Sequence, residues 1–137
     1  MFGALSTDFG SVYGFLPALP HDGPLLASAY AACRVFALPS MLETPGLAAL
    51  EAAVAGARVV VPPYGGALEY FQGFALYPNP RSVRAIRAAI LTAWNAPHDA
   101  ETQRQFILSR YSWNVVAQQT VQAYRQVFEN RHANRSM

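Results

Sequence analysis

The sequence contains no lysine. All ten of its basic residues are arginines, set against eight aspartates and glutamates in 137 residues. Only 13% of the residues are charged, and the formal net charge is +2. Because the arginines are scattered rather than gathered in one run, charge gives no argument for attraction to nucleic acid or to a membrane. A nucleic-acid-binding function is therefore not expected.

Cysteine and long apolar runs are scarce as well. The single cysteine, Cys33, cannot form an internal disulfide, so the fold needs no oxidising compartment. Arg34, Glu43, Glu51 and Arg58 interrupt the apolar runs well before the roughly 18 residues that a membrane span requires. The N-terminus lacks the basic and long apolar segments of a signal peptide. A soluble, cytoplasmic protein is expected.

The composition, 53% hydrophobic, is typical of a domain with a buried core. The length fits one domain, which we assign to residues 1–130, with a tail at 131–137. Short β-branched or aromatic runs alternate with Ala-rich stretches, a pattern typical of parallel strands joined by helices. We therefore predict an α/β fold, with a Rossmann-like parallel sheet flanked by helices on both faces.

Strands are expected near residues 34–38, 59–61 and 74–77, after a short strand and loop in SVYGFLPAL. Helices are expected in PLLASAYAAC, GLAALEAAVAG, ALEYF, SVRAIRAAILTAW and SWNVVAQQTVQAYRQVFEN, with another restarting after NAPHDAE. In the SVRAIRAAILTAW helix, the face that we expect to pack on the sheet comprises Val83, Ile86, Ile90, Leu91 and Trp94. Arg84 and Arg87 are expected on the opposite, solvated face. His98 follows in a loop and is expected to be exposed.

The segment PSMLETPGLAALEAAVAGARVVVPP, residues 39–63, carries two glutamates among Ala, Leu and Val. Thr44 can cap a helix, and Pro45 suits the first helical position. The N–H groups of Gly46, Leu47 and Ala48 would then be free to attract an anion, and Gly46 has no side chain to keep a phosphate away. The segment therefore predicts a phosphate site at a helix N-terminus.

Glu43 and Glu51 lie on either side of this predicted terminus. A glutamate only accepts hydrogen bonds and can take two vicinal hydroxyl donors at once, so sugar, phosphate and sugar in sequence would satisfy the whole segment. A nucleotide-sugar is such a ligand. The residues alone leave two alternatives open: Glu51 as a solvent-facing carboxylate, and Glu43 as a charge that stabilises the helix terminus.

The same segment resembles the nucleotide-sugar-binding segment of the group 1 retaining glycosyltransferases, which have the GT-B fold. The shared features are a Pro-Ser after a strand, a Glu-x7-Glu pair around Gly-Leu, and an Ala-rich helix ending in Gly. The resemblance continues through YGGALEYFQGFALYPNP to YSW, and upstream through FLPALPHDGPLLASAYAACRVFALPS. It covers nearly the whole chain and implies the C-terminal, donor-binding domain of such an enzyme.

The resemblance also implies roles for individual residues. Glu51 would hold the ribose hydroxyls, and Glu43 would contact the transferred sugar near its anomeric carbon as the one catalytic candidate. The donor-binding residues would be Glu43, Pro45, Gly46, Leu47, Glu51, Gly65 and Gly66. Glu69 would be structural, pairing with a nearby N–H or arginine. No cofactor and no metal ion are implied, since the donor itself is the substrate.

The chain departs from the family pattern in extent. It corresponds to only the later part of the C-terminal domain, so we expect it to be N-terminally truncated and to need an acceptor domain or partner chain. No lysine is present to bind the diphosphate, so the isolated chain is expected to be inactive. A complete enzyme could also associate peripherally with a membrane. The alternative is a non-catalytic nucleotide-sugar-binding or assembly module, whereas a nicotinamide-binding domain is excluded because no G-x-G-x-x-G follows a strand.

Overall fold

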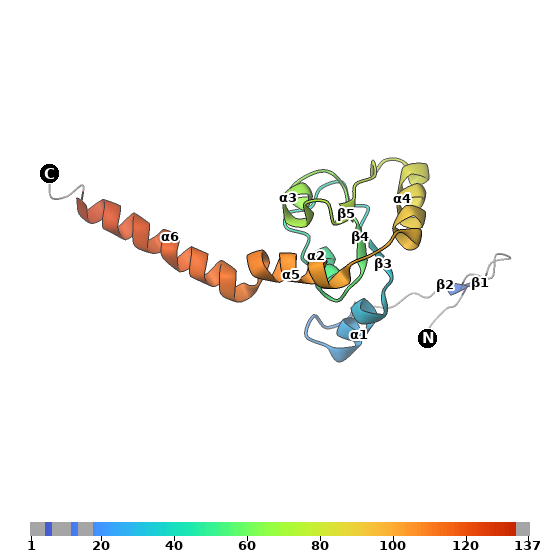
Figure 1. Ribbon diagram of the computed structural model, residues 1–137, viewed down its shortest axis with the longest axis horizontal. Helices are drawn as coiled ribbons and strands as arrows, with labels where there is room; N and C mark the ends of the chain where they lie inside the picture. Colours follow the sequence, from blue (N-terminus) through green and yellow to red (C-terminus); the bar gives the residue numbers. More distant parts are fainter. Residues whose placement is uncertain (1–4, 7–11, 14–17, 134–137) are drawn as a thin grey trace.

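The computed structural model of the chain describes residues 5–6, 12–13 and 18–133 (Figure 1). Its elements are β1 (Leu5–Ser6), β2 (Val12–Tyr13), α1 (Pro24–Ala32), β3 (Val35–Ala37), α2 (Leu47–Val54), β4 (Arg58–Val60), α3 (Ala67–Phe71), β5 (Ala75–Leu76), α4 (Val83–Asn95), α5 (Ala100–Tyr111) and α6 (Trp113–Ala133). The predicted helices and the three predicted parallel strands are all present, most of them within one or two residues of their expected bounds.

Strands β3, β4 and β5 form a parallel sheet in that order. Phe36 pairs with Val59, and Val59 pairs with Ala75, so the three strands are in register at their centres. The predicted α/β fold with a parallel sheet is thereby confirmed. Strands β1 and β2 form a separate antiparallel pair.

Helices cover both faces of this sheet, and Figure 1 shows the strands between α2 and α4. The core cluster brings Leu50 of α2 together with Val59, Val61, Phe71 and Ile107, all of them buried. Because side chains alternate along a strand, Val60 points to the other face, toward α4. The middle strand β4 is therefore buried on both sides, which fits the apolar run at residues 59–61 that overlaps it.

The C-terminal end of α2 is held by side chains from the segment that contains α5. Gln103 is fully buried, and its Nε2 donates to the carbonyls of Ala53, at 2.8 Å, and Ala57, at 3.0 Å. His98 Nε2 lies 3.0 Å from the carbonyl oxygen of Gly56. The expectation that His98 is exposed is therefore wrong: its ring is half-buried, because it reaches the backbone at the end of α2.

The face of α4 that packs on the sheet differs from the predicted one. Ile86 and Ile90 are half-buried, as expected, but Val83, Leu91 and Trp94 are 82%, 51% and 49% exposed. A helix turns roughly 100° per residue, so Leu91 points well away from the direction of Ile90. The short strands beneath α4 form a narrow surface, which buries the side of the helix that carries Ile90 but not the side that carries Leu91.

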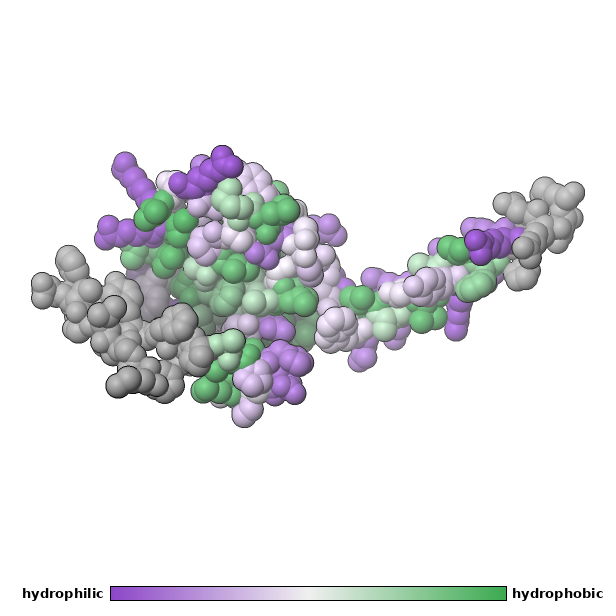
Figure 2. Space-filling view, turned by 180° about the vertical axis from the view of Figure 1, so that it is seen from behind, coloured by the Kyte–Doolittle hydropathy of each residue, from purple (hydrophilic) through white to green (hydrophobic). Residues whose placement is uncertain are grey.

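Helix α6 leaves the body of the protein and runs on alone (Figure 1). It continues to Ala133, three residues into the predicted tail, whereas residues 134–137 lie outside the described part. Trp113, Tyr124 and Phe128 on this helix are 79%, 64% and 62% exposed, and Figure 2 shows apolar and polar residues mixed along its surface. Within the described ranges, no helix is both long and apolar enough to cross a membrane.

Candidate functional site

Two loops meet at the carboxyl edge of the sheet, one following β3 and the other following β4. Glu43 and Gly65 form an isolated parallel bridge between these loops. The Gly66 N–H donates to the Glu43 carbonyl oxygen at 3.0 Å. The structure thus brings together three of the predicted site residues, Glu43, Gly65 and Gly66, at the edge where open α/β sheets bind ligands.

Position 65 must be a glycine because its backbone lies in close contact with Glu43. Its φ is +76°, a conformation that side chains disfavour, and a Cβ added to it would overlap the Glu43 carbonyl oxygen. Only glycine therefore allows the two loops to approach this closely. The consequence for the site is a fixed main chain at Glu43.

The N-terminus of α2 differs from the sequence prediction. Thr44 does not cap the helix and Pro45 does not begin it: α2 begins at Leu47, and Gly46 is the N-cap residue in the left-handed conformation, with φ 70° and ψ 49°. Glycine adopts that conformation at little cost, so the chain enters the helix through Gly46 and leaves the two residues before it in the loop. No side chain of the described residues caps this terminus.

The first hydrogen bonds of α2 run to Gly46. Its carbonyl oxygen accepts from the N–H groups of Ala49, at 3.0 Å, and Leu50, at 3.1 Å. The N–H groups of Leu47 and Ala48 precede these bonds and have no acceptor within the helix. They can therefore donate to an anion placed at the terminus.

The Glu43 carboxylate lies against this same terminus. Its Oε2 is 3.6 Å from the position that a Cβ on Gly46 would take, and the residue is half-buried. A carboxylate beside a helix N-terminus is favoured electrostatically, as the structural alternative for Glu43 requires. In this position the Glu43 carboxylate can also accept hydrogen bonds from ligand hydroxyl groups, next to the N–H groups of Leu47 and Ala48. The geometry is therefore compatible both with stabilisation of the helix terminus and with ligand binding.

Glu51 lies further along α2 and is exposed. Tyr30 of α1 is its neighbour: burial raises the pKa of the Tyr30 hydroxyl, and the charge of the Glu51 carboxylate raises it further. The carboxylate is therefore accessible to a ligand and already has a hydroxyl group close to it.

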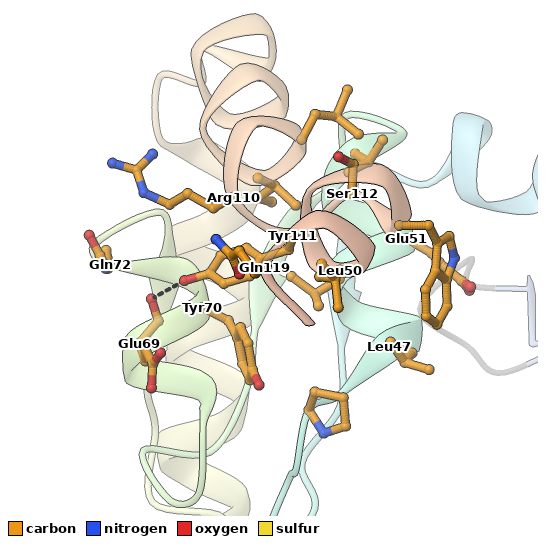
Figure 3. Close-up of a pocket in the computed structure, with 16 residues that line it drawn as sticks. Leu47, Leu50, Glu51, Glu69, Tyr70, Gln72, Arg110, Tyr111, Ser112 and Gln119 are labelled. Atoms are coloured by element: carbon orange, nitrogen blue, oxygen red, sulfur yellow. Dashed lines mark hydrogen bonds between the residues drawn. The ribbon is translucent and has the colours of Figure 1, made fainter. Parts of the chain in front are cut away.

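A groove of about 740 Å³ runs beside Glu51, between α2, α3, α5 and the start of α6 (Figure 3). Of the predicted site residues, Pro45, Leu47 and Glu51 line it. Glu43, Gly46, Gly65 and Gly66 do not, and instead form the loop cluster at the sheet edge. The predicted site residues are thus divided between the groove and the loop cluster, which lie next to each other at α2.

The opposite wall of the groove contains residues to which the sequence assigned no role in binding. Tyr70 and Tyr111 pack edge to face with ring centroids 4.9 Å apart. The Tyr111 hydroxyl donates to the Glu69 carbonyl oxygen at 3.3 Å, the dashed line in Figure 3. Burial raises the pKa of Tyr111, the charge of Glu69 raises it further, and Arg110 opposes this. The expected pairing of the Glu69 carboxylate stays a prediction, since the bond observed here uses its backbone.

A family model described as "Glycosyl transferases group 1" matches residues 14–113. The chain belongs to the group 1 glycosyltransferases. The matched range contains the whole sheet, both glutamates and α1 to α5, and it ends where α6 begins. The family resemblance inferred from the segment around the two glutamates is thereby confirmed.

Two similar proteins support this assignment to the group 1 glycosyltransferases. An uncharacterized glycosyltransferase of Methanocaldococcus jannaschii is 32% identical over 114 residues, which cover 79% of this chain and 29% of the relative. The structure of a sucrose-phosphate synthase from Thermosynechococcus elongatus superposes with a TM-score of 0.65 at 30% identity, over 77% of this chain and 28% of that one. The fold matches that of a GT-B glycosyltransferase, consistent with its C-terminal domain.

The chain spans less than a third of the length of either protein. Most of each relative therefore lies outside the region matched to this group 1 glycosyltransferase chain. In the part of the chain that the structure describes, no three His, Cys, Asp or Glu side chains gather into a group that could hold a metal ion. The sequence-based expectation about cofactors stays a prediction.

Proposed function

We propose that this chain is the donor-binding part of a retaining glycosyltransferase that transfers a hexose from a nucleoside-diphosphate sugar to an acceptor. The observation that carries the proposal is the junction of Glu43 with Gly65 and Gly66, next to the open N-terminus of α2. It places an acceptor of hydroxyl hydrogen bonds beside donors for a phosphate, at the edge of a parallel sheet.

Each part of the donor has a partner in this arrangement. The diphosphate is met by the N–H groups of Leu47 and Ala48, which also stabilise the negative charge that develops as the sugar departs. Hydroxyl groups of the transferred sugar donate to Glu43. The two ribose hydroxyls donate to Glu51, which is exposed on the same helix.

The rest of the enzyme lies outside this chain in the proposal. An acceptor-binding domain, or a partner chain that supplies one, completes the active site, in keeping with the length of the relatives. The reaction belongs to carbohydrate biosynthesis in the cytoplasm and uses no metal ion. Arginines of the chain or basic residues of the missing part take the role that lysine has in the family.

The second candidate is a module that binds nucleotide-sugars or assembles with other chains without transferring anything itself. All residues of the proposed binding site lie within the described part of this chain, which is what this alternative requires. The two candidates share the binding site and differ in catalysis. A complementation assay separates them, because only the enzyme part regains transfer when an acceptor domain from a relative is added.

Titration calorimetry with UDP, ADP and GDP, and with a hexose derivative of each, tests the shared part of the proposal. One nucleotide series should bind, and the Glu51→Gln chain should bind it about tenfold or more weakly, the scale of a hydrogen bond to a charged group. Glu101→Gln is the matched control, since Glu101 is exposed on α5 and does not line the groove. Absence of binding by every nucleotide would refute the proposal.

A further inference from the structure

Four exposed side chains form one continuous strip on the outside of α4. Arg84, Arg87, Leu91 and Trp94 follow each other at spacings of three, four and three residues, which places them on the same side of a helix. The opposite side of α4 packs on β3 and β4. Figure 2 shows hydrophilic side chains projecting beside hydrophobic ones at the upper left, over α4.

A third arginine joins the strip from another part of the chain. The Arg34 guanidinium lies over the Trp94 ring, 4.6 Å from its centroid. Its Nε and Nη2 donate to the Trp94 carbonyl oxygen at 3.2 and 2.9 Å. We call these five residues, Arg34, Arg84, Arg87, Leu91 and Trp94, the α4 surface.

The stretch of sequence that contains α4 carries charge of one sign. Residues 70–98 contain three arginines and no aspartate or glutamate. The next acid along the chain, Asp99, is engaged at the start of α5, where its carboxylate accepts from the N–H of Thr102 at 3.0 Å and from its hydroxyl at 2.6 Å. The net charge of +2 for the whole chain therefore conceals a local excess of positive charge.

We propose that the α4 surface binds an anionic lipid bilayer. The arginines would contact headgroup phosphates, while Trp94 and Leu91 enter the interfacial layer, where indole and aliphatic groups next to cationic ones are stable. A nucleic acid would satisfy the arginines but would offer no comparable environment for Leu91. The mixture of cationic and large apolar side chains on one strip is what favours the bilayer.

The proposed contact leaves the donor site free. No residue of α4 lines the groove beside Glu51, and none belongs to the loop cluster around Glu43. Bilayer binding and donor binding can therefore occur together. The inference is also independent of the proposed donor chemistry, because it depends on other residues and is tested without any nucleotide.

The two tryptophans of the chain allow a direct test. In a Trp113→Phe chain, Trp94 is the sole tryptophan and reports on the α4 surface. Vesicles of phosphatidylcholine with about one third phosphatidylglycerol should shift its fluorescence to the blue, protect it from acrylamide and carry the chain upward in a flotation gradient. Vesicles of phosphatidylcholine alone should do none of these, and added salt should weaken binding.

Paired variants assign the binding to α4. Arg84→Gln with Arg87→Gln should weaken partitioning by on the order of thirtyfold, since each cationic residue near the surface contributes about a factor of five. Arg104→Gln with Arg125→Gln removes the same charge from exposed positions on α5 and α6 and should leave partitioning nearly unchanged.

Four outcomes would overturn the proposal. Equal losses in both pairs would show that only net charge matters. Equal binding to neutral vesicles would show that apolar contact alone is responsible. Flotation without a shift of Trp94 would place the contact on another surface such as α6. A Trp94 shift with duplex DNA but not with vesicles would identify a nucleic-acid surface instead.

Discussion

Gly65 lies so close to Glu43 that a single added carbon would overlap the Glu43 carbonyl oxygen. The contact joins the loops after β3 and β4 and fixes the backbone of a proposed donor-binding residue. Other glycines with positive φ lack such a contact. Substitutions at Gly65 and at one of these glycines can therefore separate the cost of the overlap from the cost of backbone strain.

Gly65→Ala should reduce the free energy of unfolding by about 3 kcal/mol or more, from backbone strain and overlap together. Gly73→Ala is the matched control: Gly73 has φ 97° and no atom within 4 Å of an added Cβ. The free energy of unfolding of the Gly73→Ala chain should fall by only about 1 kcal/mol, because this substitution causes backbone strain but no overlap. Urea denaturation of both variants measures the difference, and equal losses would mean that the loop moves to relieve the overlap.

Gln103→Leu should destabilise the chain by about 1–3 kcal/mol, because the carbonyls of Ala53 and Ala57 would lose a buried donor. Gln105→Leu provides the comparison. Gln105 is exposed and bonds only the Glu101 carboxylate on its own helix, at 3.0 Å, so its loss should cost less than about 0.5 kcal/mol. Thermal unfolding of the two variants decides whether Gln103 holds the end of α2 as proposed.

Glu51→Ala should weaken binding of the nucleoside diphosphate by roughly 1–3 kcal/mol, because it removes the acceptor for both ribose hydroxyls. Glu43→Ala should hardly change that affinity, since its proposed partner is the sugar, and removal of a like charge can even favour the diphosphate. Calorimetry on both variants reads out the asymmetry. Equal losses would argue that both carboxylates only support α2.

The isolated chain should show no measurable sugar transfer with any nucleotide-sugar. In the proposal the acceptor site lies outside it, as does most of the length of the relatives. No lysine is present to assist the N–H groups of Leu47 and Ala48 at the diphosphate. Incubation with radiolabelled donors and a panel of sugar and lipid acceptors measures this. Turnover by the pure chain would show that catalysis resides in residues described here.

Stability should fall as the solution is made alkaline through the raised pKa of Tyr30. Burial and the Glu51 carboxylate raise this pKa above its ordinary value of 10.0, so the folded state holds the proton more tightly than the unfolded state. The stabilising contribution is complete below pH 10 and is lost as the pH rises through the folded-state pKa. Urea midpoints between about pH 8 and 11 should decline less in Tyr30→Phe than in the unaltered chain.

Much of the fold could be predicted because its signals are local. Val59 to Val61 are a β-branched run before two prolines, and the strand, Arg58–Val60, is shifted from that run by only one residue. The start of α2 could not be predicted in the same way, because Thr44 and Pro45 form a valid capping pattern and only the left-handed Gly46 sets the true start. The exposure of Leu91 and Trp94 could not be predicted for a third reason: it depends on the width of the sheet beneath α4, which no residue of α4 encodes.

The single residue between α5 and α6 has a hydrodynamic consequence. Ser112 adopts an extended conformation, with φ −64° and ψ 149°, so the 21 residues of α6 start in a new direction and project by about 31 Å. A 14.9 kDa chain of this shape meets more friction than a sphere of equal mass. It should sediment more slowly, tumble anisotropically in NMR relaxation, and give a pair-distance distribution in X-ray scattering with a long shoulder.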